Sequence, residues 1–461
     1  NISEKCDWIN TEEDPFFHGI GKYDTDPKGN KCFYDYSVDA TVVAKKPDGS
    51  TYFPVIDTLN YAEKLKEYPI GTVILITDPD HDRLTVCQIE NKNSIDFLNH
   101  TGISYSELDN DRILCVYTAN QSFLLIMNFW AEQLKASNRW NNHPRFIIKT
   151  TASAKSWDEW AKFNGIKVVN VPVGFKEIAN IMKKVEKQIV DNPDKDVIIT
   201  DVFGNDINLG KNPRMIFGGE ESGGMIIGSE ELIKSKSGRV AIAMREKSAS
   251  EAIIIASALI SSLEKENKTL SNAIEEIFRE NNIIAKYDVR EDIAYYNESE
   301  PDIEKLIKAK KDGETKRTKN DLFYLTLALA FYENKININQ IKSIFKSVFK
   351  NLNFENLTDI KFVGDGTYLK FTDKFIEIRP SGTDAKTKAY GSGSDKENIS
   401  EFSRILGRYS GDLTKEYIAF ISKNYYNNAK EQSMREYLKF TNKDFDTRVF
   451  EIPDYRKTLN I

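Results

Sequence analysis

Cysteine and histidine are both scarce in this chain, whose 461 residues contain four of each. The cysteines, Cys6, Cys32, Cys87 and Cys115, are widely spaced and form no C-x-x-C pair. This spacing argues against a disulfide framework and a cysteine-based zinc site, and it indicates reduced thiols in a cytosolic protein. The histidines are equally scattered, which argues against a histidine-rich metal site.

The chain also lacks a long apolar run and an excess of basic residues. Its longest apolar stretch, Ala252–Leu263, is interrupted by serines and predicts a buried helix rather than a membrane span. Residues 1–30 are polar and charged, so we expect no signal peptide. A net charge of −6 without a long basic stripe argues against a nucleic-acid partner. We therefore expect a cytoplasmic protein with neither membrane nor nucleic-acid partners.

A length of 461 residues is too great for one hydrophobic core and predicts about three domains. We place them at residues 1–116, 117–282 and 283–461, with a helical insertion near 302–350. Strand and helix patterns alternate between residues 146 and 217, which indicates an α/β domain with a mixed or parallel sheet. Helices are expected at 58–68, 119–137, 156–164, 175–190, 248–280, 302–350 and 395–422, and strands at 72–77, 146–150, 166–171, 197–200, 215–217, 285–300 and 360–391.

Three carboxylates follow one short apolar strand, in the run Thr72-Val-Ile-Leu-Ile-Thr-Asp-Pro-Asp-His-Asp-Arg83. Alternate carboxylates, here Asp78, Asp80 and Asp82, can converge on one hard cation at the end of a strand. Three oxygen ligands suit Mg²⁺ bound together with a phosphate oxygen, and Arg83 can hold that phosphate through two hydrogen bonds. A solvated turn is the alternative for such a run. A calcium-binding EF-hand is excluded because its glycine and glutamate positions are occupied by other residues.

Phe217-Gly-Gly-Glu-Glu-Ser-Gly-Gly224 also follows an expected strand. Its glycines allow a ligand to approach the backbone closely. Between them, Glu220 and Ser222 provide a charged acceptor and a hydroxyl, which would suit two vicinal sugar hydroxyls. A glycine-rich turn with solvated acids is the alternative.

Arg379-Pro-Ser-Gly-Thr-Asp384 has the composition of an anion-binding turn. Gly382 permits a tight turn whose N–H groups point inward, and Ser381 and Thr383 add hydroxyl donors. Arg379 adds a guanidinium group, with Lys386 and Lys388 close behind. A hairpin turn flanked by basic residues would have the same composition.

Two lysines lie beside expected helix N-termini. In Val173-Gly-Phe-Lys176, a cation opposes the helix macrodipole, which suggests that Lys176 is placed for a ligand. A solvated lysine is the ordinary interpretation. Arg245-Glu-Lys247 precedes the long helix and raises the same question.

Taken in chain order, these motifs resemble the α-D-phosphohexomutases, the phosphoglucomutase and phosphomannomutase family. Asp78–Arg83 is similar to the family's D-P-D-G/A-D-R metal loop, and Val173–Lys176 to its sugar-selecting V-G-F-K. Gly219–Gly223 resembles the G-E-x-S-G sugar loop, and Arg379–Asp384 the R-x-S-G-T-E phosphate loop. The resemblance runs from about residue 55 to 420.

The resemblance implies an isomerase that interconverts hexose 1-phosphate and hexose 6-phosphate. A phosphoserine would donate phosphate to the sugar, with Mg²⁺ on the three aspartates, and the bisphosphorylated sugar would reorient and return its other phosphate. The Glu-Glu-Ser sequence looks more like glucose-type members, although mannose phosphate stays open. The implied fold is a series of mixed α/β domains followed by an α+β domain, as a monomer or homodimer. Implied catalytic residues are Arg83 and Lys247, and implied substrate-binding residues are Gly174, Lys176, Glu220, Ser222, Arg379, Ser381, Gly382, Thr383 and Lys388.

The main departure from the family concerns the nucleophile. Its T-A-S-H-N-P motif stands before the metal loop, and no such motif precedes Asp78. Thr151-Ala-Ser153 imitates three of its residues, but after the loop. Because the chain begins with Asn1 rather than Met, we expect that the serine-bearing first domain is missing and that this chain alone is inactive. A non-catalytic sugar-phosphate-binding or regulatory relative is the alternative.

Smaller departures lie beside the motifs. His81 replaces a small residue and either adds a metal ligand or faces solvent. Ser248-Ala-Ser250 stands where the family usually has Asp-Gly, and Asp384 replaces a glutamate.

Overall fold

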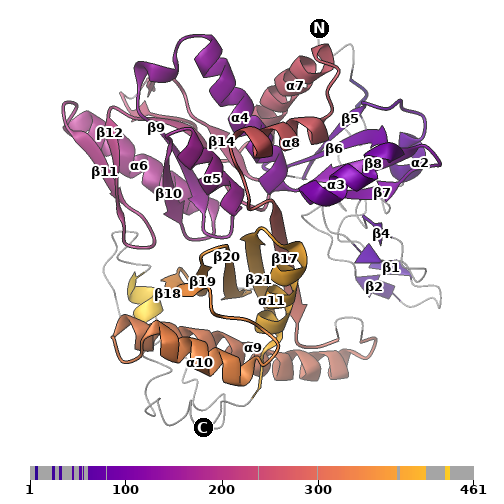
Figure 1. Ribbon diagram of the computed structural model, residues 1–461, viewed down its shortest axis with the longest axis vertical. Helices are drawn as coiled ribbons and strands as arrows, with labels where there is room; N and C mark the ends of the chain where they lie inside the picture. Colours follow the sequence, from indigo (N-terminus) through magenta and orange to yellow (C-terminus); the bar gives the residue numbers. More distant parts are fainter. Residues whose placement is uncertain are drawn as a thin grey trace.

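The computed structural model describes residues 6–8, 23–25, 31–33, 44–45, 51–53, 56, 61–78, 80–236, 238–297, 300–381, 385–411 and 431–436. Within this part of the chain, the longer strands form three sheets. Figure 1 shows the first two sheets above the third, with β17 leading from the upper tier to the lower one. The mixture of sheets and helices confirms the predicted α/β fold class.

The first sheet has the order β5-β6-β8-β7, and its neighbouring strands are antiparallel. Side chains alternate between its two faces, as the pleat of a strand requires. Val86 and Ile113 face one hydrophobic cluster, whereas Cys87 and Ile89 face another. Both faces are therefore covered. The elements of this region are α2 (Tyr61–Leu65), β5 (Val73–Thr77), β6 (Leu84–Asn91), η3 (Lys92–Ser94), α3 (Ile95–Thr101), β7 (Ser104–Glu107) and β8 (Arg112–Tyr117).

The second sheet has the order β10-β9-β13-β14; β9 is parallel to β10 and β13, and β14 is antiparallel. Phe146 and Ile148 pack toward α6, and Ile147 packs on the opposite side with α4 and α5. Helices thus cover both faces. The elements are α4 (Ala119–Ala136), η4 (Trp140–Asn142), β9 (Arg145–Thr150), α5 (Lys155–Phe163), β10 (Lys167–Val171), α6 (Phe175–Asp191), β13 (Arg214–Gly219), β14 (Met225–Ile227), α7 (Ala249–Lys265) and α8 (Leu270–Glu280).

One hydrophobic cluster joins the first and second sheets. It includes Leu84 and Ile113 from the first sheet, Phe217 from the second, and Phe123 from α4 between them. The Phe123 ring lies 5.4 Å from Phe217 and 6.3 Å from Trp157. The core therefore continues across residues 116 and 117, where the sequence suggested a boundary.

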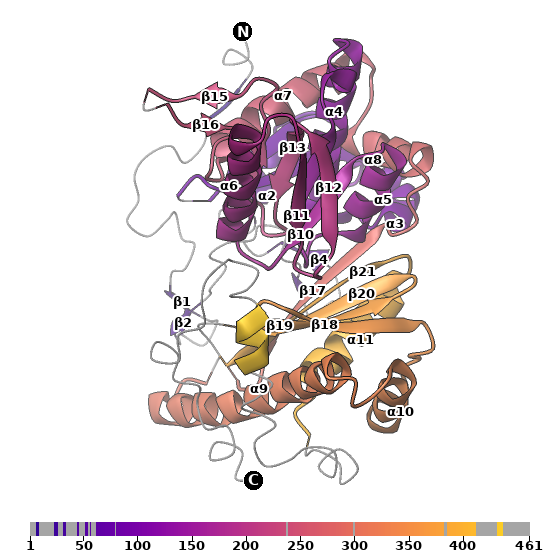
Figure 2. The ribbon, with the colours of Figure 1, turned by 90° about the vertical axis from the view of Figure 1, so that its left-hand side faces the viewer.

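The third sheet has the order β17-β21-β20-β19-β18 and is antiparallel. Ile376 and Ile378 belong to the hydrophobic cluster formed with α9, α10 and α11, whereas Glu377 and Arg379 point to the other face. Figure 2 shows α9 and α10 beneath this sheet. The elements are β17 (Tyr287–Ala294), α9 (Ile303–Tyr332), α10 (Ile338–Val348), β18 (Leu357–Val363), β19 (Gly366–Phe371), β20 (Lys374–Pro380), β21 (Lys386–Gly393) and α11 (Lys396–Arg408).

Several expected elements are shorter than the sequence suggested. The helix expected at 395–422 ends at Arg408, because the Tyr409 ring packs 4.7 Å from Phe323 and 5.1 Å from Phe349 and leads the chain away. Residues 412–422 lie outside the described part. The strand expected at 285–300 ends at Ala294, and the helix expected at 58–68 ends at Leu65 as α2, with residues 58–60 outside the described part.

The strand expected at 197–200 does not join the second sheet. It forms β11 (Asp196–Thr200), which pairs with β12 (Asp206–Lys211) as a separate hairpin. The Gln188 side chain on α6 donates to the Ile198 carbonyl at 2.8 Å and accepts from its N–H at 3.0 Å, which fastens β11 to the helix.

The remaining strands form short pairs: β1 (Tyr23–Thr25) with β2 (Lys31–Phe33), β3 (Ala44–Lys45) with β4 (Thr51–Tyr52), and β15 (Ile233–Lys234) with β16 (Val240–Ala241). Residues 431–436 are helical. Among the residues that the structure describes, no helix combines the length and the apolar character that crossing a membrane requires.

Candidate functional site

The Asp78–Arg83 run forms the turn between the antiparallel strands β5 and β6, which begin to pair at Thr77 and Leu84. One oxygen of Asp78 accepts the backbone N–H groups of Asp82 and Arg83, each at 3.0 Å, and this closes the turn. Pro79 lies outside the described residues. The turn brings one carboxylate oxygen from each of Asp78, Asp80 and Asp82 within 4.8 Å of the others.

His81 occupies the sharpest point of this turn. Its φ of 56° lies in the left-handed region, and its side chain is exposed, as the solvent-facing alternative required. The His81 N–H donates to the Asp78 carbonyl at 3.0 Å, and its own carbonyl accepts the Ala249 N–H at 3.0 Å. The turn is thereby attached to the first residue of α7.

The three aspartates have the properties of a cation site. Burial, together with the neighbouring Asp82 and Asp80, raises the pKa of Asp78 to about 6, although the N–H groups of Arg83 and Asp82 oppose this increase. Oδ1 of Asp82 is buried and has no hydrogen-bond partner among the described residues. Crowded, partly desolvated carboxylates are stabilised by a positive charge, and oxygen ligands suit Mg²⁺. The residues present therefore fit this metal.

Two cations, Lys247 and Arg83, and the glycine-rich loop at residues 217–224 contact the Asp78–Arg83 turn, which we call the aspartate turn. Lys247 Nζ lies 3.0 Å from Asp82 Oδ2 and 3.4 Å from Glu220 Oε1, so it links the two loops. Arg83 Nε lies 3.5 Å from Asp82 Oδ1 and 3.6 Å from Asp78 Oδ2. Chain segments far apart in the sequence thus form one cluster of alternating charge.

The glycines of the 219–224 loop make this contact sterically possible. The Gly223 carbonyl accepts the Leu84 N–H at 3.1 Å, which holds the loop against the start of β6. A Cβ atom on Gly224 would lie 2.5 Å from Lys247 Cδ and 3.0 Å from Glu220 Oε1. Glycine at this position therefore leaves the space that the lysine occupies.

Glu220 is buried within this cluster. Its burial raises the pKa of the carboxyl, and the neighbouring Glu221 adds to this effect, whereas Lys247 and the Ser222 hydroxyl oppose it. A buried carboxylate beside a hydroxyl and a lysine can accept and orient the hydroxyl groups of a ligand.

A second charged cluster lies on the polar face of the third sheet. Arg379 binds Asp365 through two contacts, Nε to Oδ1 at 3.1 Å and Nη2 to Oδ2 at 3.2 Å. Burial opposes the charge of Arg379, but Asp365 outweighs it and raises the pKa of the guanidinium. Lys388 lies opposite Arg379 on β21, and burial together with Arg290 lowers its pKa. These cations form a candidate anion-binding surface.

The turn after Arg379 is held from beneath by α9. The Ser381 N–H donates to the Lys386 carbonyl at 2.9 Å, and the Ser381 carbonyl accepts from Arg317 Nη1 at 2.6 Å. Gly382, Thr383 and Asp384 lie outside the described residues, so their predicted roles stay predictions. Sequence reasoning missed both Asp365 and Arg317, because neither lies in a motif.

Glu221 connects the glycine-rich loop to the second cluster. The Thr150 hydroxyl donates to Glu221 Oε2 at 2.7 Å, and the carboxylate acts on the pKa of Lys388 and Tyr390 in the third sheet. Sequence reasoning singled out Glu220 and missed its neighbour. The doubled acid in Gly219-Glu-Glu-Ser-Gly223 was the available signal.

Three other residues from the sequence analysis lie apart from the aspartate turn. Lys176 is exposed near the start of α6, with Nζ 3.9 Å from Glu177 Oε1. Gly174 precedes that helix with a φ of 126°, which only glycine adopts readily. The Ser153 hydroxyl is fully buried and lies 2.8 Å from the Thr150 hydroxyl, so a substrate cannot reach it.

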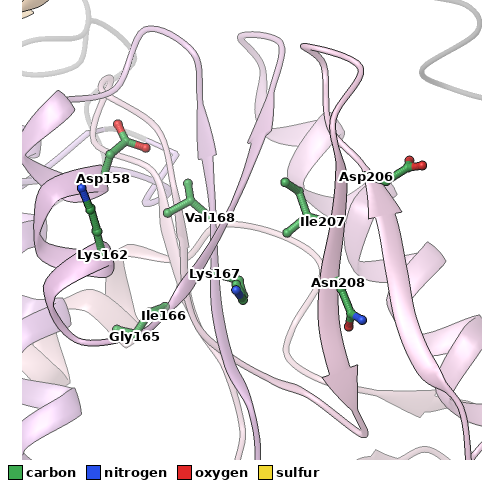
Figure 3. Close-up of a pocket in the computed structure, with 9 residues that line it drawn as sticks. All are labelled: Asp158, Lys162, Gly165, Ile166, Lys167, Val168, Asp206, Ile207 and Asn208. Atoms are coloured by element: carbon green, nitrogen blue, oxygen red, sulfur yellow. The ribbon is translucent and has the colours of Figure 1, made fainter. Parts of the chain in front are cut away.

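A separate cavity of about 550 Å³ lies between α5, β10 and β12. Figure 3 shows Asp158 and Lys162 at its helical side and Asp206 at its hairpin side. Its acids already have partners, since Asp158 binds Lys149 Nζ at 2.6 Å and Asp206 accepts from the Thr200 hydroxyl at 2.6 Å. This cavity contains none of the candidate catalytic residues.

Residues 119–280 match the family model for phosphoglucomutase/phosphomannomutase, alpha/beta/alpha domain III. This range begins at α4 and ends at α8, and it includes the glycine-rich loop and Lys247. No curated protein matches the chain by sequence.

Solved structures of proteins described as phosphomannomutase, phosphoglucomutase or N-acetylphosphoglucosamine mutase resemble this chain only distantly. A protein from Thermus thermophilus assigned as a phosphomannomutase has 14% identity and a TM-score of 0.38, covering 77% of this chain and 50% of its own. Parafusin, a phosphoglucomutase from Paramecium, has 14% identity and a TM-score of 0.38, with coverages of 84% and 48%. An Aspergillus fumigatus N-acetylphosphoglucosamine mutase, in complex with GlcNAc-6P and magnesium, has 11% identity and a TM-score of 0.37, with coverages of 76% and 53%. The chain spans about half the length of these proteins.

Proposed function

We propose that this chain belongs to the phosphoglucomutase/phosphomannomutase family, whose domain III model matches residues 119–280, and that it supplies the metal-, sugar- and phosphate-binding parts of a phosphohexomutase. The reaction is the interconversion of hexose 1-phosphate and hexose 6-phosphate, with glucose favoured over mannose. The single observation that carries this proposal is the position of Lys247, whose Nζ joins the aspartate turn and the Glu220 loop at 3.0 and 3.4 Å.

In this proposal, the aspartate turn holds Mg²⁺ through Asp78, Asp80 and Asp82. When bound, the metal neutralises charge on a transferring phosphoryl group. Arg83 and Lys247 add fixed positive charge beside the same place, and phosphoryl transfer depends chiefly on such positioning and charge stabilisation. The reacting phosphate therefore belongs beside this turn.

The remaining residues hold the parts of the substrate that do not react. Glu220 and Ser222 orient the sugar hydroxyls, while Arg379, Ser381 and Lys388 bind the distal phosphate. Gly382, Thr383, Gly174 and Lys176 complete the proposed substrate contacts. A bisphosphorylated sugar that reorients between the two charged clusters could present either phosphate to the aspartate turn.

In this proposal Ser153 is not the nucleophile, because its side chain is buried. The 461-residue chain should then bind Mg²⁺ and sugar phosphate weakly and show no turnover by itself. A reduced, cytoplasmic setting also remains part of the proposal, in keeping with the free thiols of Cys87 and Cys115.

The deciding experiment is a coupled assay on the natural full-length protein with Mg²⁺, using glucose 1-phosphate, mannose 1-phosphate and N-acetylglucosamine 6-phosphate in parallel. We expect formation of glucose 6-phosphate to be fastest. The R379A variant should lose substrate affinity, and the exposed-surface variant E401Q should behave as wild type. Binding without turnover on all three sugars would instead support the non-catalytic relative, and no binding would contradict both.

A further inference from the structure

The face of the third sheet that carries Glu377 and Arg379 meets the region of the second sheet along a contact that we call the seam. It consists of residues 150–155, 172–173 and 203 on one side and β18–β21 on the other. The Lys155 N–H donates to the Ser392 hydroxyl at 2.9 Å, and Lys361 Nζ donates to the Phe203 carbonyl at 3.0 Å. The Phe203 and Tyr368 rings lie 5.0 Å apart. Figure 1 shows this seam between the upper and lower tiers.

Glu377 lies inside the seam without a hydrogen bond. It has 0% exposure, and in the described part of the chain neither of its carboxyl oxygens has a hydrogen-bond partner. The nearby Thr151 hydroxyl, on the opposite side of the seam, is also buried and without a partner there. An ionised carboxylate in such surroundings is strongly disfavoured, whereas a neutral acid can donate a hydrogen bond.

The charged groups around Glu377 do not supply a cation for it. Arg379 lies two residues away on β20, but its guanidinium is bound at two points by Asp365. Glu221 from the glycine-rich loop and Asp365 from the β18–β19 turn add negative charge, and Tyr368 and Tyr390 flank Glu377 on β19 and β21. Burial is the main cause that raises the pKa of Glu377 to about 8, and Thr151 and Arg379 oppose it only in part.

We propose that Glu377 is a positioning residue that holds the seam closed as a neutral acid, with its O–H donating to the Thr151 hydroxyl. On ionisation the proton passes to water, and the remaining carboxylate repels Glu221 and requires hydration. The loop at 150–155 then separates from β20. Since Arg379 is on the same face of β20, the anion-binding surface moves with it. This inference concerns the seam itself and does not require the chain to be a mutase.

The direction of the pH dependence follows from linkage. A glutamate freed by opening has its usual pKa near 4.5, whereas the pKa in the closed seam is about 8. The closed state therefore binds more protons between these values, and its opening constant rises about tenfold per pH unit up to about pH 8, then levels off. Burial raises the pKa of Asp288, beside Ser392, only to about 6, so the interval from pH 6 to 8 isolates Glu377.

Hydrogen exchange of the full chain between about pH 5.5 and 9.5, corrected for intrinsic exchange rates, tests the proposal in peptides covering residues 150–155 and 374–380. Wild type should lose protection by roughly a hundredfold from pH 6 to 8. E377Q should remain protected with no slope, whereas D288N and the exposed control E401Q should keep the wild-type slope. A slope that persists in E377Q would overturn the proposal.

T151V provides an independent variant that keeps the side-chain shape and removes the hydroxyl. It should be less protected than wild type at pH 6, and equal protection there would contradict the bridging role of Thr151. Sulfate binding, measured by thermal stabilisation of the same samples, keeps the two proposals distinguishable. If protection of the seam depends on pH as expected but the chain does not bind sulfate, the role of Glu377 is supported. That result contradicts only the proposed anion site.

Discussion

Two adjacent glutamates of the glycine-rich loop, Glu220 and Glu221, lie in different charged clusters. Glu220 lies 3.4 Å from Lys247 Nζ at the aspartate turn, whereas Glu221 accepts a hydrogen bond from Thr150 at 2.7 Å and faces the third sheet. The turn that follows β13, in which the Gly223 N–H donates to the Glu220 carbonyl at 3.3 Å, lets one short loop contact both charged clusters. Glu221, which lies between the motif residues Glu220 and Ser222, therefore connects the glycine-rich loop to the third sheet.

The aspartate turn yields a prediction about single residues. D82N should weaken Mg²⁺ binding by at least about tenfold, or ~1.4 kcal/mol, because it removes one charged oxygen ligand while the two hydrogen bonds to Asp78 that close the turn remain. Isothermal titration calorimetry with MgCl₂ measures this change. D111N, in the exposed turn before β8, is the matched control and should bind like wild type. Equal affinity in D82N and wild type would show that the metal lies elsewhere.

At the scale of elements, the two halves of α9 have different surroundings. Phe323 is fully buried and contacts the rings of Phe345 and Phe349, each at 6.1 Å, whereas Ile303 and Ile307 near the start of the helix are largely exposed. The segment 302–350 is helical, as the sequence predicted, and its second half forms part of the core under the third sheet.

This contrast predicts unequal effects of truncation along α9. F323A should lower the free energy of unfolding by about 3–5 kcal/mol, because it leaves a cavity among aromatic side chains. I307A should change it by less than about 0.5 kcal/mol. Urea unfolding followed by circular dichroism compares the two variants. Similar losses in both would mean that the exposed half is also packed in solution.

At the scale of the whole molecule, the first and second sheets share one large core, whereas the third sheet contacts them through the seam, which holds the small hydrophobic cluster of Ala152, Phe375 and Tyr390. Phe123 of α4 lies at the centre of the shared core, beside Phe217 and Trp157. Regions that share a large hydrophobic core unfold together, while a smaller contact between regions allows separate opening. We expect two cooperative units rather than one per sheet.

F123A tests this arrangement. It should destabilise by about 3–5 kcal/mol and lower hydrogen-exchange protection in β6 and β8 as much as in β9 and β13. Protection in β19–β21 should change little. Loss confined to β9 and β13 would mean that the first sheet unfolds independently, and the exposed variant E401Q should leave all three regions unchanged.

The sequence predicted the order of elements well where local patterns are strong. The apolar stripe and the Thr118–Gln121 capping box define α4, which ends one residue before the expected position. The predicted ends of elements were wrong where contacts with distant residues determine them. At Arg408, for example, the aromatic packing of Tyr409 ends the helix. The carboxylates, glycines and cations of the candidate site were found in the same way, because each motif is contiguous.

By itself, the sequence determined which chemical groups stand together in the candidate site: the three aspartates of one turn, the acids and glycines of one loop, and the basic turn at Arg379. These properties depend on residues next to one another in the chain, so composition and spacing reveal them. Only the tertiary structure decided which groups meet. It attached Lys247 to Asp82, bound Arg379 to Asp365, buried Ser153, and enclosed Glu377 in the seam. Such pairs join residues far apart in the chain, and it is packing that determines their distances and their burial.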